Sequence, residues 1–461
     1  MVARGPVVVV GLARSGVAAA AFLARRGETV VGTDRRPAGE LQGEAVTSLR
    51  QLGVRLELGG HHAGTFTGAS LVVVSPGVAP DLPELVAARA ASVPVIAEIE
   101  LAFSHLRGTL AAVTGTKGKS TTTAALGAML REDGRDVRVG GNIGEALIGL
   151  VEGSTERTVF AVEVSSFQLE GIERFHPQVA VLLNITPDHL DRHPSFEAYA
   201  GAKARVFANQ TAADFSVVNA DDPQALRLAR AGRARVLPFR PGGGLPAGDG
   251  AFFAEGAARL KLSGATETLF PLALVRLPGA HLAGDLLAAA TAARLLGASG
   301  AAIARAVAGF EGVEHVLELV AAIAGVAYYN DSKATNVEAA RQSLLAFSAP
   351  VLLVLGGRYK GGDFADLAPA LRDHGKRVLA IGEAASRIEQ SLGSVLPVER
   401  CVSLPEAVRR AHAAAAPGDV VLLAPGCSSF DMFRDYAERG RVFKAAVRRL
   451  LTGTGGEPAL G

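Results

Sequence analysis

The sequence predicts an α/β protein with parallel sheets, because short apolar runs typical of buried strands alternate with alanine- and leucine-rich runs typical of helices. Most of the apolar runs end in clusters of glycine and polar residues. At 461 residues the chain is long enough for about three domains. We predict a Rossmann-like domain over residues 1–94, a central phosphate-loop ATPase-like domain over 95–311, and a C-terminal Rossmann-like doubly wound domain over 312–461.

The composition narrows the class of protein. The formal net charge of +2 gives no sign of a nucleic-acid or membrane-surface partner. Cys401 and Cys427 are too few for a disulfide framework and fit a reduced cytoplasm as small apolar residues. No signal peptide is evident, and no apolar run reaches the roughly 20 residues that span a bilayer. These observations predict a cytoplasmic protein without membrane insertion.

The first domain is predicted from a glycine turn, residues 11–16, between a strand and a helix. Ala13 stands where the second glycine of a dinucleotide fingerprint belongs, which weakens a NAD interpretation but leaves another nucleotide open. Asp34 ends the second strand, where a carboxylate can accept hydrogen bonds from a ribose or a base; a plain turn residue is an equal alternative. The strands are predicted at Val7–Val10, 28–33 and Leu71–Val74, with a helix at 17–26.

The second domain opens with a segment typical of triphosphate binding, a strand and a glycine turn that lead into a helix. Glycines let backbone N–H groups converge on phosphate oxygens, Lys119 would reach the terminal phosphates, and Ser120 would ligate Mg²⁺. Val113 replaces the first glycine of the full motif, and an ordinary glycine turn is the alternative. The loop residues are Gly115, Thr116, Lys117, Gly118, Lys119, Ser120 and Thr121.

Three more strands of this domain, at 137–139, 158–162 and 179–183, end in polar clusters. Glu163 could hold Mg²⁺ there or could serve a helix N-terminus. His189 could be a ligand or a solvated histidine, and we interpret His193 as structural. Lys203 lies in a predicted helix, 196–208, where residue chemistry alone gives it no special role. Residues 237–250 are rich in glycine and proline and predict a flexible surface loop.

The third domain repeats the pattern of strands followed by polar loops. Lys333, Arg358 and Lys360 lie in those loops, where they could bind an anionic substrate or could be surface charges. The strands are predicted at 326–329, 351–355, 378–381 and Val420–Leu423.

Taken together, these motifs resemble the Mur ligase family, the ATP-dependent amino-acid ligases of peptidoglycan precursor synthesis. The phosphate loop, residues 114–121, is similar to the family's ATP loop, and three strand-end segments at 141–144, 163–170 and 184–191 are similar to its central-domain motifs. Two further segments, 330–336 and 425–431, are similar to the branch that adds D-glutamate. The resemblance covers nearly the whole chain.

The resemblance implies a monomeric, cytoplasmic ligase that joins D-glutamate to UDP-N-acetylmuramoyl-L-alanine through an acyl phosphate, with ATP and two Mg²⁺ ions. It thereby implies a part in cell-wall biogenesis, cell shape, cell division and the cell cycle. The third domain would close over the central one to bring the amine to the acyl phosphate.

The resemblance also assigns site residues. Lys119, Glu163, His189 and Lys203 would be catalytic. Ser120 and Glu163 would hold one Mg²⁺, and His189 a second one together with Lys203 as a carbamate. Asp285 and Asp331 would face the nucleotide together with the phosphate loop. The UDP-substrate would contact Ser15, Asp34, Arg35, Arg36, Gly77, Asn142, Ser165 and Gln168, and D-glutamate would contact Thr335, Lys360, Ser429 and Phe430.

Three positions depart from the family pattern. Leu282 and Asp285 replace asparagines, of which the second would face adenine, and Val316 replaces a phosphate-facing arginine. Rival interpretations are another amide ligase of the same fold, such as another Mur ligase or a folylpolyglutamate synthase, a NAD-dependent oxidoreductase, and a nucleotide-switch binding protein. The oxidoreductase leaves the phosphate loop unexplained, and the switch leaves the other strand-end motifs unexplained.

Overall fold

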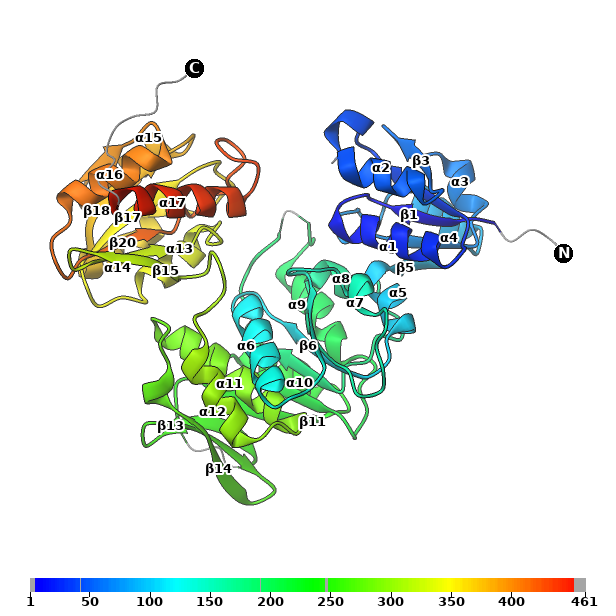
Figure 1. Cartoon of the computed structure of the whole chain (residues 1–461), viewed down its shortest axis with the longest axis horizontal. Helices are drawn as coiled ribbons and strands as arrows, with labels where there is room; N and C mark the ends of the chain where they lie inside the picture. Colours follow the sequence, from blue (N-terminus) through cyan, green and yellow to red (C-terminus); the bar gives the residue numbers. More distant parts are fainter. Residues whose placement is uncertain (1–4, 42, 191, 245–247, 452–461) are drawn as a thin grey trace. The chain divides into compact units, whose positions relative to one another are not determined.

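The computed structural model describes residues 5–41, 43–190, 192–244 and 248–451. It divides into two compact units. Figure 1 labels the helices and strands along the chain. The first unit comprises Met1–Val275 and Gly284–Gly309, and the second unit comprises Arg276–Ala283 and Phe310–Gly461. The first unit holds two sheets and the second unit holds one.

The N-terminal sheet has five parallel strands in the order β3-β2-β1-β4-β5. The order reverses direction beside β1, and loops at the carboxyl ends of β1 and β4 therefore face a common crevice. The last strand lies just beyond residue 94, the predicted end of the first domain. The strands are β1 (Val7–Val10), β2 (Val30–Asp34), β3 (Arg55–Leu58), β4 (Leu71–Val74) and β5 (Val95–Ala97). The helices are α1 (Arg14–Arg25), η1 (Ala38–Glu40), α2 (Gly43–Gln51), α3 (Ala63–Thr67) and α4 (Pro83–Ala90).

The central sheet has nine strands in the order β14-β13-β12-β11-β10-β9-β6-β8-β7. The strands from β7 to β12 are parallel, and β12, β13 and β14 form an antiparallel ribbon with a bulge at Ala258/Arg259. The strands are β6 (Thr109–Thr114), β7 (Val137–Gly141), β8 (Val159–Glu163), β9 (Val179–Leu182), β10 (Phe215–Asn219), β11 (Arg235–Arg240), β12 (Gly250–Ala254), β13 (Ala257–Leu262) and β14 (Ala265–Pro271).

The helices around this sheet are α5 (Glu98–His105), α6 (Lys119–Glu132), α7 (Leu147–Leu150), α8 (Ser166–Glu170), α9 (Phe196–Ala204), η2 (Arg205–Phe207), α10 (Pro223–Arg230), η3 (Leu272–Leu274), α11 (Ala280–Leu295) and α12 (Gly300–Gly309). Strands and helices alternate from β6 to β11, as parallel pairing requires, and η3, α11 and α12 follow β14. The helix predicted over 196–208 ends at Ala204 as α9 and continues as η2. β11 takes up the start of the loop predicted at 237–250, of which residues 245–247 lie outside the described part.

The C-terminal sheet has six strands in the order β15-β16-β20-β17-β18-β19, parallel except for the pair β15 and β16. Its strands are β15 (Glu318–Ile323), β16 (Val326–Asn330), β17 (Val351–Gly356), β18 (Gly375–Ile381), β19 (Val398–Arg400) and β20 (Val420–Leu423). Its helices are α13 (Val337–Leu344), η4 (Phe364–Leu367), α14 (Ala368–His374), α15 (Ala385–Leu392), α16 (Leu404–Ala414) and α17 (Tyr436–Leu451).

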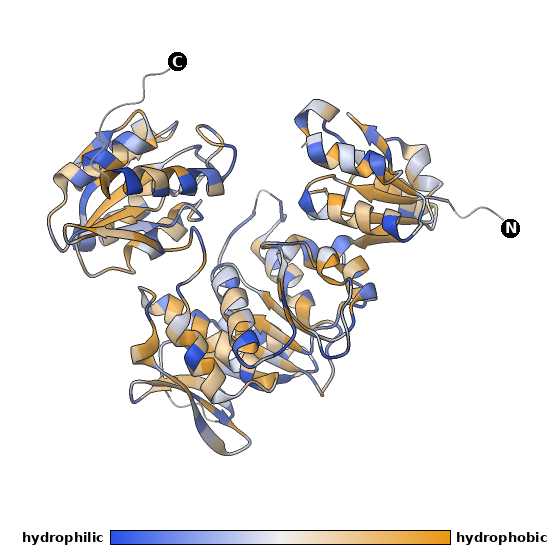
Figure 2. Cartoon of the chain, in the orientation of Figure 1, coloured by the Kyte–Doolittle hydropathy of each residue, from blue (hydrophilic) through white to orange (hydrophobic). Residues whose placement is uncertain are grey.

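Apolar side chains on both faces of the strands build the cores, and the strands are accordingly the most hydrophobic parts of the chain (Figure 2). In β1, Val7 and Val9 pack in the cluster that contains α1, whereas Val8 and Val10 pack with Phe66 of α3. Burial on both faces is expected of parallel sheets covered by helices on each side. These three sheets confirm the predicted α/β fold class. None of the described helices has the length and apolar character needed to cross a membrane.

Candidate active site

The phosphate loop joins β6 to α6 and is fixed by the end of the neighbouring strand β9. Gly115 has a φ of +151° and Gly118 has a φ of +83°, and both angles lie where residues other than glycine are strained. Asn184 accepts hydrogen bonds from the loop, through its backbone carbonyl from Thr116 N–H (2.9 Å) and through Oδ1 from Lys117 N–H (2.8 Å). Asn184 therefore shapes the loop, a role that its place in a strand-end motif does not indicate.

Two residues of the loop reach a carboxylate and a carbonyl. Ser120 Oγ donates a hydrogen bond to Glu163 Oε2 (2.6 Å), and Lys119 Nζ donates one to the Thr116 carbonyl (2.9 Å). Asn142 Nδ2 donates to the other oxygen, Glu163 Oε1 (2.6 Å). Glu163 ends β8, which pairs with β6, so sheet register places its carboxylate beside the loop. The structure thus brings Lys119, Ser120, Glu163 and Asn142 together.

Glu163 does not cap the helix that follows it, because Ser165 is the N-cap residue of that helix. Ser165 precedes α8, accepts a hydrogen bond from Gln168 N–H (3.2 Å), and forms a capping box with the Gln168 side chain. Glu163 is buried, with 1% of its surface exposed, and its carboxylate lies against the Ser120 hydroxyl. A hydroxyl and a carboxylate side by side are hard oxygen donors, the kind that Mg²⁺ prefers, so these two residues fit that ion.

Lys203 lies beneath the loop rather than on the surface. Its side chain is buried, its Nζ donates a hydrogen bond to the Gly115 carbonyl (2.8 Å), and it lies 4.7 Å from the centroid of the Tyr199 ring. Burial lowers the pKa of Lys203 well below its ordinary value, and the charge of Lys119 lowers it further. This direction favours the neutral form of the amine relative to an exposed lysine.

The Tyr199 ring lies near both Lys203 and His189. The Tyr199 hydroxyl is 3.0 Å from Thr116 Oγ1, and its ring lies 6.3 Å from the ring of the exposed His189, which has a φ of +55°. His193 is buried instead, and its Nε2 hydrogen-bonds Ser166 Oγ (3.0 Å). Sequence reasoning did not select Tyr199, since an aromatic residue in a helix usually signals only core packing.

The remaining loop residues differ in burial. Thr116 and Thr121 are buried, and Gly118 and Lys117 are partly exposed. Asp285 of α11 lies against Gly118 with 8% of its surface exposed, which brings a residue far away in the sequence to the phosphate loop.

The N-terminal glycine turn is organised by a carboxylate. Asp34 Oδ2 accepts a hydrogen bond from Leu12 N–H (2.7 Å), and the Arg36 guanidinium donates to both carboxylate oxygens (2.9 and 2.7 Å). Burial alone would raise the pKa of Asp34, but the hydrogen bonds from Arg36 and Leu12 outweigh it and lower the pKa to about 2. Ser15 is half-buried in the first turn of α1, and Arg35 and Gly77 are exposed.

A pocket in the first unit is lined by residues of both the N-terminal part and the central part. Arg192 crosses between them and donates a hydrogen bond to the Val78 carbonyl (2.9 Å), while Arg14 donates to the Asn142 carbonyl (2.9 Å). The pocket lining includes Ser75, Pro76, Ala97, Phe167, Gln168 and Gly171. Among the predicted UDP-substrate residues, Gln168 lines this pocket, and Asn142 lies next to Glu163.

In the second unit, two strand-end loops are held together by a buried arginine. Arg439 donates hydrogen bonds to Ser332 Oγ (2.9 Å), to the Ser332 carbonyl (2.8 Å) and to the Cys427 carbonyl (3.1 Å). The two loops carry Asp331, which is predicted for the nucleotide, and Thr335, Ser429 and Phe430, which are predicted for D-glutamate. Burial lowers the pKa of Arg439 to about 10. Its burial could not be foreseen, because α17 is otherwise rich in exposed charges.

The predicted residues of these loops have different surroundings. Asp331 is buried and accepts a hydrogen bond from Ser343 Oγ, and Thr335 N–H donates to the Lys333 carbonyl (2.9 Å). Lys360 Nζ lies 5.7 Å from the centroid of the exposed Phe430 ring. Ser429 is buried at the start of the tight turn that leads to Phe430.

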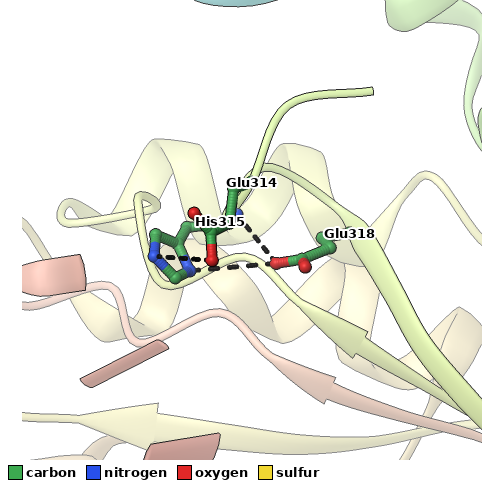
Figure 3. A group of neighbouring side chains, drawn as sticks. All are labelled: Glu314, His315 and Glu318. Carbon is green, nitrogen blue, oxygen red and sulfur yellow. Dashed lines mark hydrogen bonds and ion pairs between the residues drawn. The ribbon is translucent and has the colours of Figure 1, made fainter. Parts of the chain in front are cut away.

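Glu314, His315 and Glu318 present potential ligand atoms within 4.8 Å of one another (Figure 3). Lys444 donates hydrogen bonds to both carboxylates, so the group is an ion-pair network that already contains its cation. His315 Nδ1 is 2.8 Å from Asn330 Nδ2, and the His315 carbonyl accepts from Lys333 N–H (3.2 Å). The network therefore supports the loop that contains Asp331.

Three family models match the chain. They are described as Mur ligase MurD-like N-terminal domain (residues 5–97), Mur ligase middle domain (residues 113–293), and Mur ligase glutamate ligase domain (residues 317–427). Two curated relatives are named UDP-N-acetylmuramoylalanine–D-glutamate ligase. The one from Acidobacterium capsulatum is 48% identical, covering 96% of this chain and 95% of the relative. The one from Geotalea daltonii is 45% identical, covering 97% and 98%.

Solved structures show the same fold at low identity. UDP-N-acetylmuramate-alanine ligase MurC from Thermotoga maritima is 20% identical with a TM-score of 0.62, covering 97% of this chain and 100% of that one. The MurF ligase from Thermotoga maritima, solved in complex with ADP, is 17% identical with a TM-score of 0.60, covering 92% and 96%.

Proposed function

The chain belongs to the Mur ligase family, and from that premise we propose that it joins D-glutamate to UDP-N-acetylmuramoyl-L-alanine with ATP, forming ADP and phosphate. The observation that carries the proposal is the cluster of Lys119, Ser120 and Glu163 at the phosphate loop, in a chain whose near full-length relatives bear that ligase's name. It would act as a cytoplasmic monomer in peptidoglycan precursor synthesis.

The first step is phosphoryl transfer at the phosphate loop. An oxygen of the L-alanyl carboxylate attacks the γ-phosphorus of ATP, the bond to the β-phosphate oxygen breaks, and ADP leaves. Lys119 supplies positive charge to the transferring group, and the start of α6 orients backbone dipoles toward the phosphates. Its present hydrogen bond to the Thr116 carbonyl keeps the ammonium at the loop.

Ser120 and Glu163 would hold one Mg²⁺, and His189 with a modified Lys203 would hold a second. Bound there, Mg²⁺ would neutralise charge on the phosphoryl oxygens. Asn142 keeps the Glu163 carboxylate in place through its hydrogen bond to Oε1.

The second step is amide formation. The D-glutamate amine attacks the acyl carbon, the tetrahedral intermediate expels phosphate, and the amine loses a proton. In the second unit, Lys360 and the Ser429–Phe430 turn would hold the D-glutamate carboxylates, and Arg439 keeps the turn and the 330–336 loop in register. Asp34, Arg36 and Gln168 would hold the UDP-substrate.

We also propose that Lys203 is carbamylated in the active enzyme. The neutral Lys203 amine would attack CO₂, form an N–C bond and release a proton, which gives an anionic oxygen ligand. The buried position and lowered pKa support this proposal. Lys203→Ala should be nearly inactive and partly restored by an added short carboxylate. A carbamate signal from isotope-labelled CO₂ should appear in the wild type; an active enzyme without that signal contradicts the modification.

The deciding experiment measures phosphate release with ATP, UDP-N-acetylmuramoyl-L-alanine and each candidate amino acid. We expect release that depends on both D-glutamate and the UDP-substrate. Release with a folate substrate and L-glutamate would instead identify another ligase of the same fold. Within the D-glutamate reaction, Lys360→Ala should raise the KM for D-glutamate far more than the KM for ATP. The reverse pattern would show that Lys360 has been misassigned.

A further inference from the structure

The Asp285 carboxyl group lies directly over the bend of the phosphate loop. A Cβ placed on Gly118 would overlap both carboxylate oxygens of Asp285. Gly118 is the residue before α6, and its φ of +83° already favours glycine. Thr122, in the first turn of α6, donates a long hydrogen bond to the Asp285 backbone carbonyl (3.5 Å). Two contacts thus tie the start of α6 to this part of α11.

This position is the one that an anionic ligand of the loop would approach. Helix N-termini with glycine turns bind phosphate because their N–H groups and dipole favour negative charge. An ionised carboxylate at the same bend would repel a phosphate, whereas a neutral carboxylic acid would not. The charge state of Asp285 therefore matters for whatever anion the loop holds.

The surroundings of Asp285 favour the neutral form. Burial raises the pKa of Asp285 to about 8, and the charge of Lys119 pulls it back only in part. Two further residues near Asp285 carry no charge: Thr122 lies on α6, and Pro241 lies against Gly284, next to Asp285.

We propose that the phosphate loop binds its nucleotide together with a proton on Asp285, so that the neutral acid is the form that accepts the triphosphate. The inference rests on the proposed function, because it needs a nucleotide at this loop. Binding and protonation are then reciprocal: low pH favours the nucleotide, and the nucleotide favours the proton. ATP affinity should be constant below the midpoint of this titration and should fall as pH rises through it.

The test is ATP binding by calorimetry, without the UDP-substrate, from about pH 7.5 to about pH 9.5, a range in which the terminal phosphate has already lost its last proton. We expect the wild-type Kd for ATP to weaken by at least about tenfold across this range. Asp285→Asn keeps the shape and removes the titration, so its Kd should stay nearly flat. Asp133→Asn, at the other end of α6, is the matched control and should behave like the wild type.

A second measurement does not depend on the variant. Titrations of the wild type in two buffers of different ionisation enthalpy report the protons taken up on binding, and we expect uptake near pH 8. Equal pH slopes in wild type and Asp285→Asn, or binding without proton uptake, would overturn the inference and leave the ATP site standing. If the wild type failed to bind ATP at about pH 7.5, the lower end of the tested pH range, the ATP site itself would be overturned.

Discussion

Two glycine turns in the first unit share a backbone design and differ in charge. The turn after β1 has Gly11 at a φ of +84° and leads into α1, and the turn after β6 has Gly118 at a φ of +83° and leads into α6. Around the first turn, Asp34 accepts the Leu12 N–H and pairs with Arg36. Around the second, Lys119 and Ser120 follow the glycine at once.

The difference indicates that a glycine turn provides a place where a ligand can approach the backbone, and that the neighbouring side chains determine which ligand groups are favoured there. A carboxylate that already accepts a loop N–H favours hydroxyl and N–H donors, such as a ribose or a base, and disfavours a phosphate at that point. A lysine and a hydroxyl favour phosphate oxygens. The first turn also has a packing role, because a Cβ on Gly16 would overlap the Gly11 carbonyl and approach Ser75 Oγ.

The sharpest way to break the comparison is to remove the charge from the second turn. Lys119→Ala should lower turnover by about 10³-fold or more while the fold stays intact, because a fixed positive charge on the transferring phosphate is lost. Steady-state phosphate release and circular dichroism would measure both effects. Lys261→Ala, on the antiparallel ribbon, is the control and should retain activity. Near-normal turnover in folded Lys119→Ala would remove the phosphate role from this turn.

The packing role of the first turn predicts a loss of stability rather than of chemistry. Gly16→Ala should lower the free energy of unfolding by about 2–3 kcal/mol, because the new methyl group meets backbone that has no room to move. Gly64→Ala, in α3 with nothing within 4 Å of its added Cβ, is the matched substitution and should be neutral or slightly stabilising. Urea unfolding would compare the two. Equal stabilities would refute the close approach of α1 to β1.

The charge of the first turn should affect one substrate only. Asp34→Asn removes the negative charge and one of the two acceptor oxygens that Leu12 and Arg36 share, and we expect the KM for the UDP-substrate to rise by about tenfold, near 1.4 kcal/mol, with the KM for ATP unchanged. Steady-state kinetics with each substrate varied in turn gives both constants. A parallel rise in the ATP constant would mean that the two turns do not act separately.

The smallest effect is the acid sensitivity of the same residue. The folded pKa of Asp34, about 2, lies below that of an unfolded aspartate, so its stabilising contribution is complete above about pH 4 and is lost as the pH falls through the folded value. Because Arg36 is partly exposed, we expect only about 1 kcal/mol. Urea unfolding of wild type and Asp34→Asn at falling pH should show the difference between them shrinking. A difference that grows toward acid pH would reverse the assigned sign.

The parts of the fold that the sequence predicted best are runs bounded by glycine or proline. The structure has strands at Val7–Val10, Leu71–Val74 and Val420–Leu423, as predicted, because β-branched and leucine runs are buried on both faces there. The antiparallel ribbon of β12 to β14 was not predicted, since Gly256 and Gly264 interrupt short segments whose side chains are partly exposed.

In the candidate active site, the residues at strand ends could be predicted from the sequence, but the side chains that they contact could not. Glu163 comes next to Ser120 because β6 and β8 pair, and that register is set by the whole sheet. Lys203 contacts Gly115 and Asp285 contacts Gly118 across long separations in sequence, which no local pattern reports. Functional residues that lie together in one sequence segment could thus be predicted. Contacts between residues far apart in the sequence, which helix packing brings together, could not.

The antiparallel ribbon of β12 to β14 affects whether molecules of this protein associate through their sheet edges in concentrated solution. β14 stands at the end of the order in the described central sheet, where a strand's outward backbone groups can recruit a strand of another molecule. Here the bulge twists the ribbon, Glu267 pairs with Arg294 (2.9 Å), and Pro271 ends the strand without a backbone N–H to donate. These features disfavour pairing of β14 with a strand of another molecule in the folded protein.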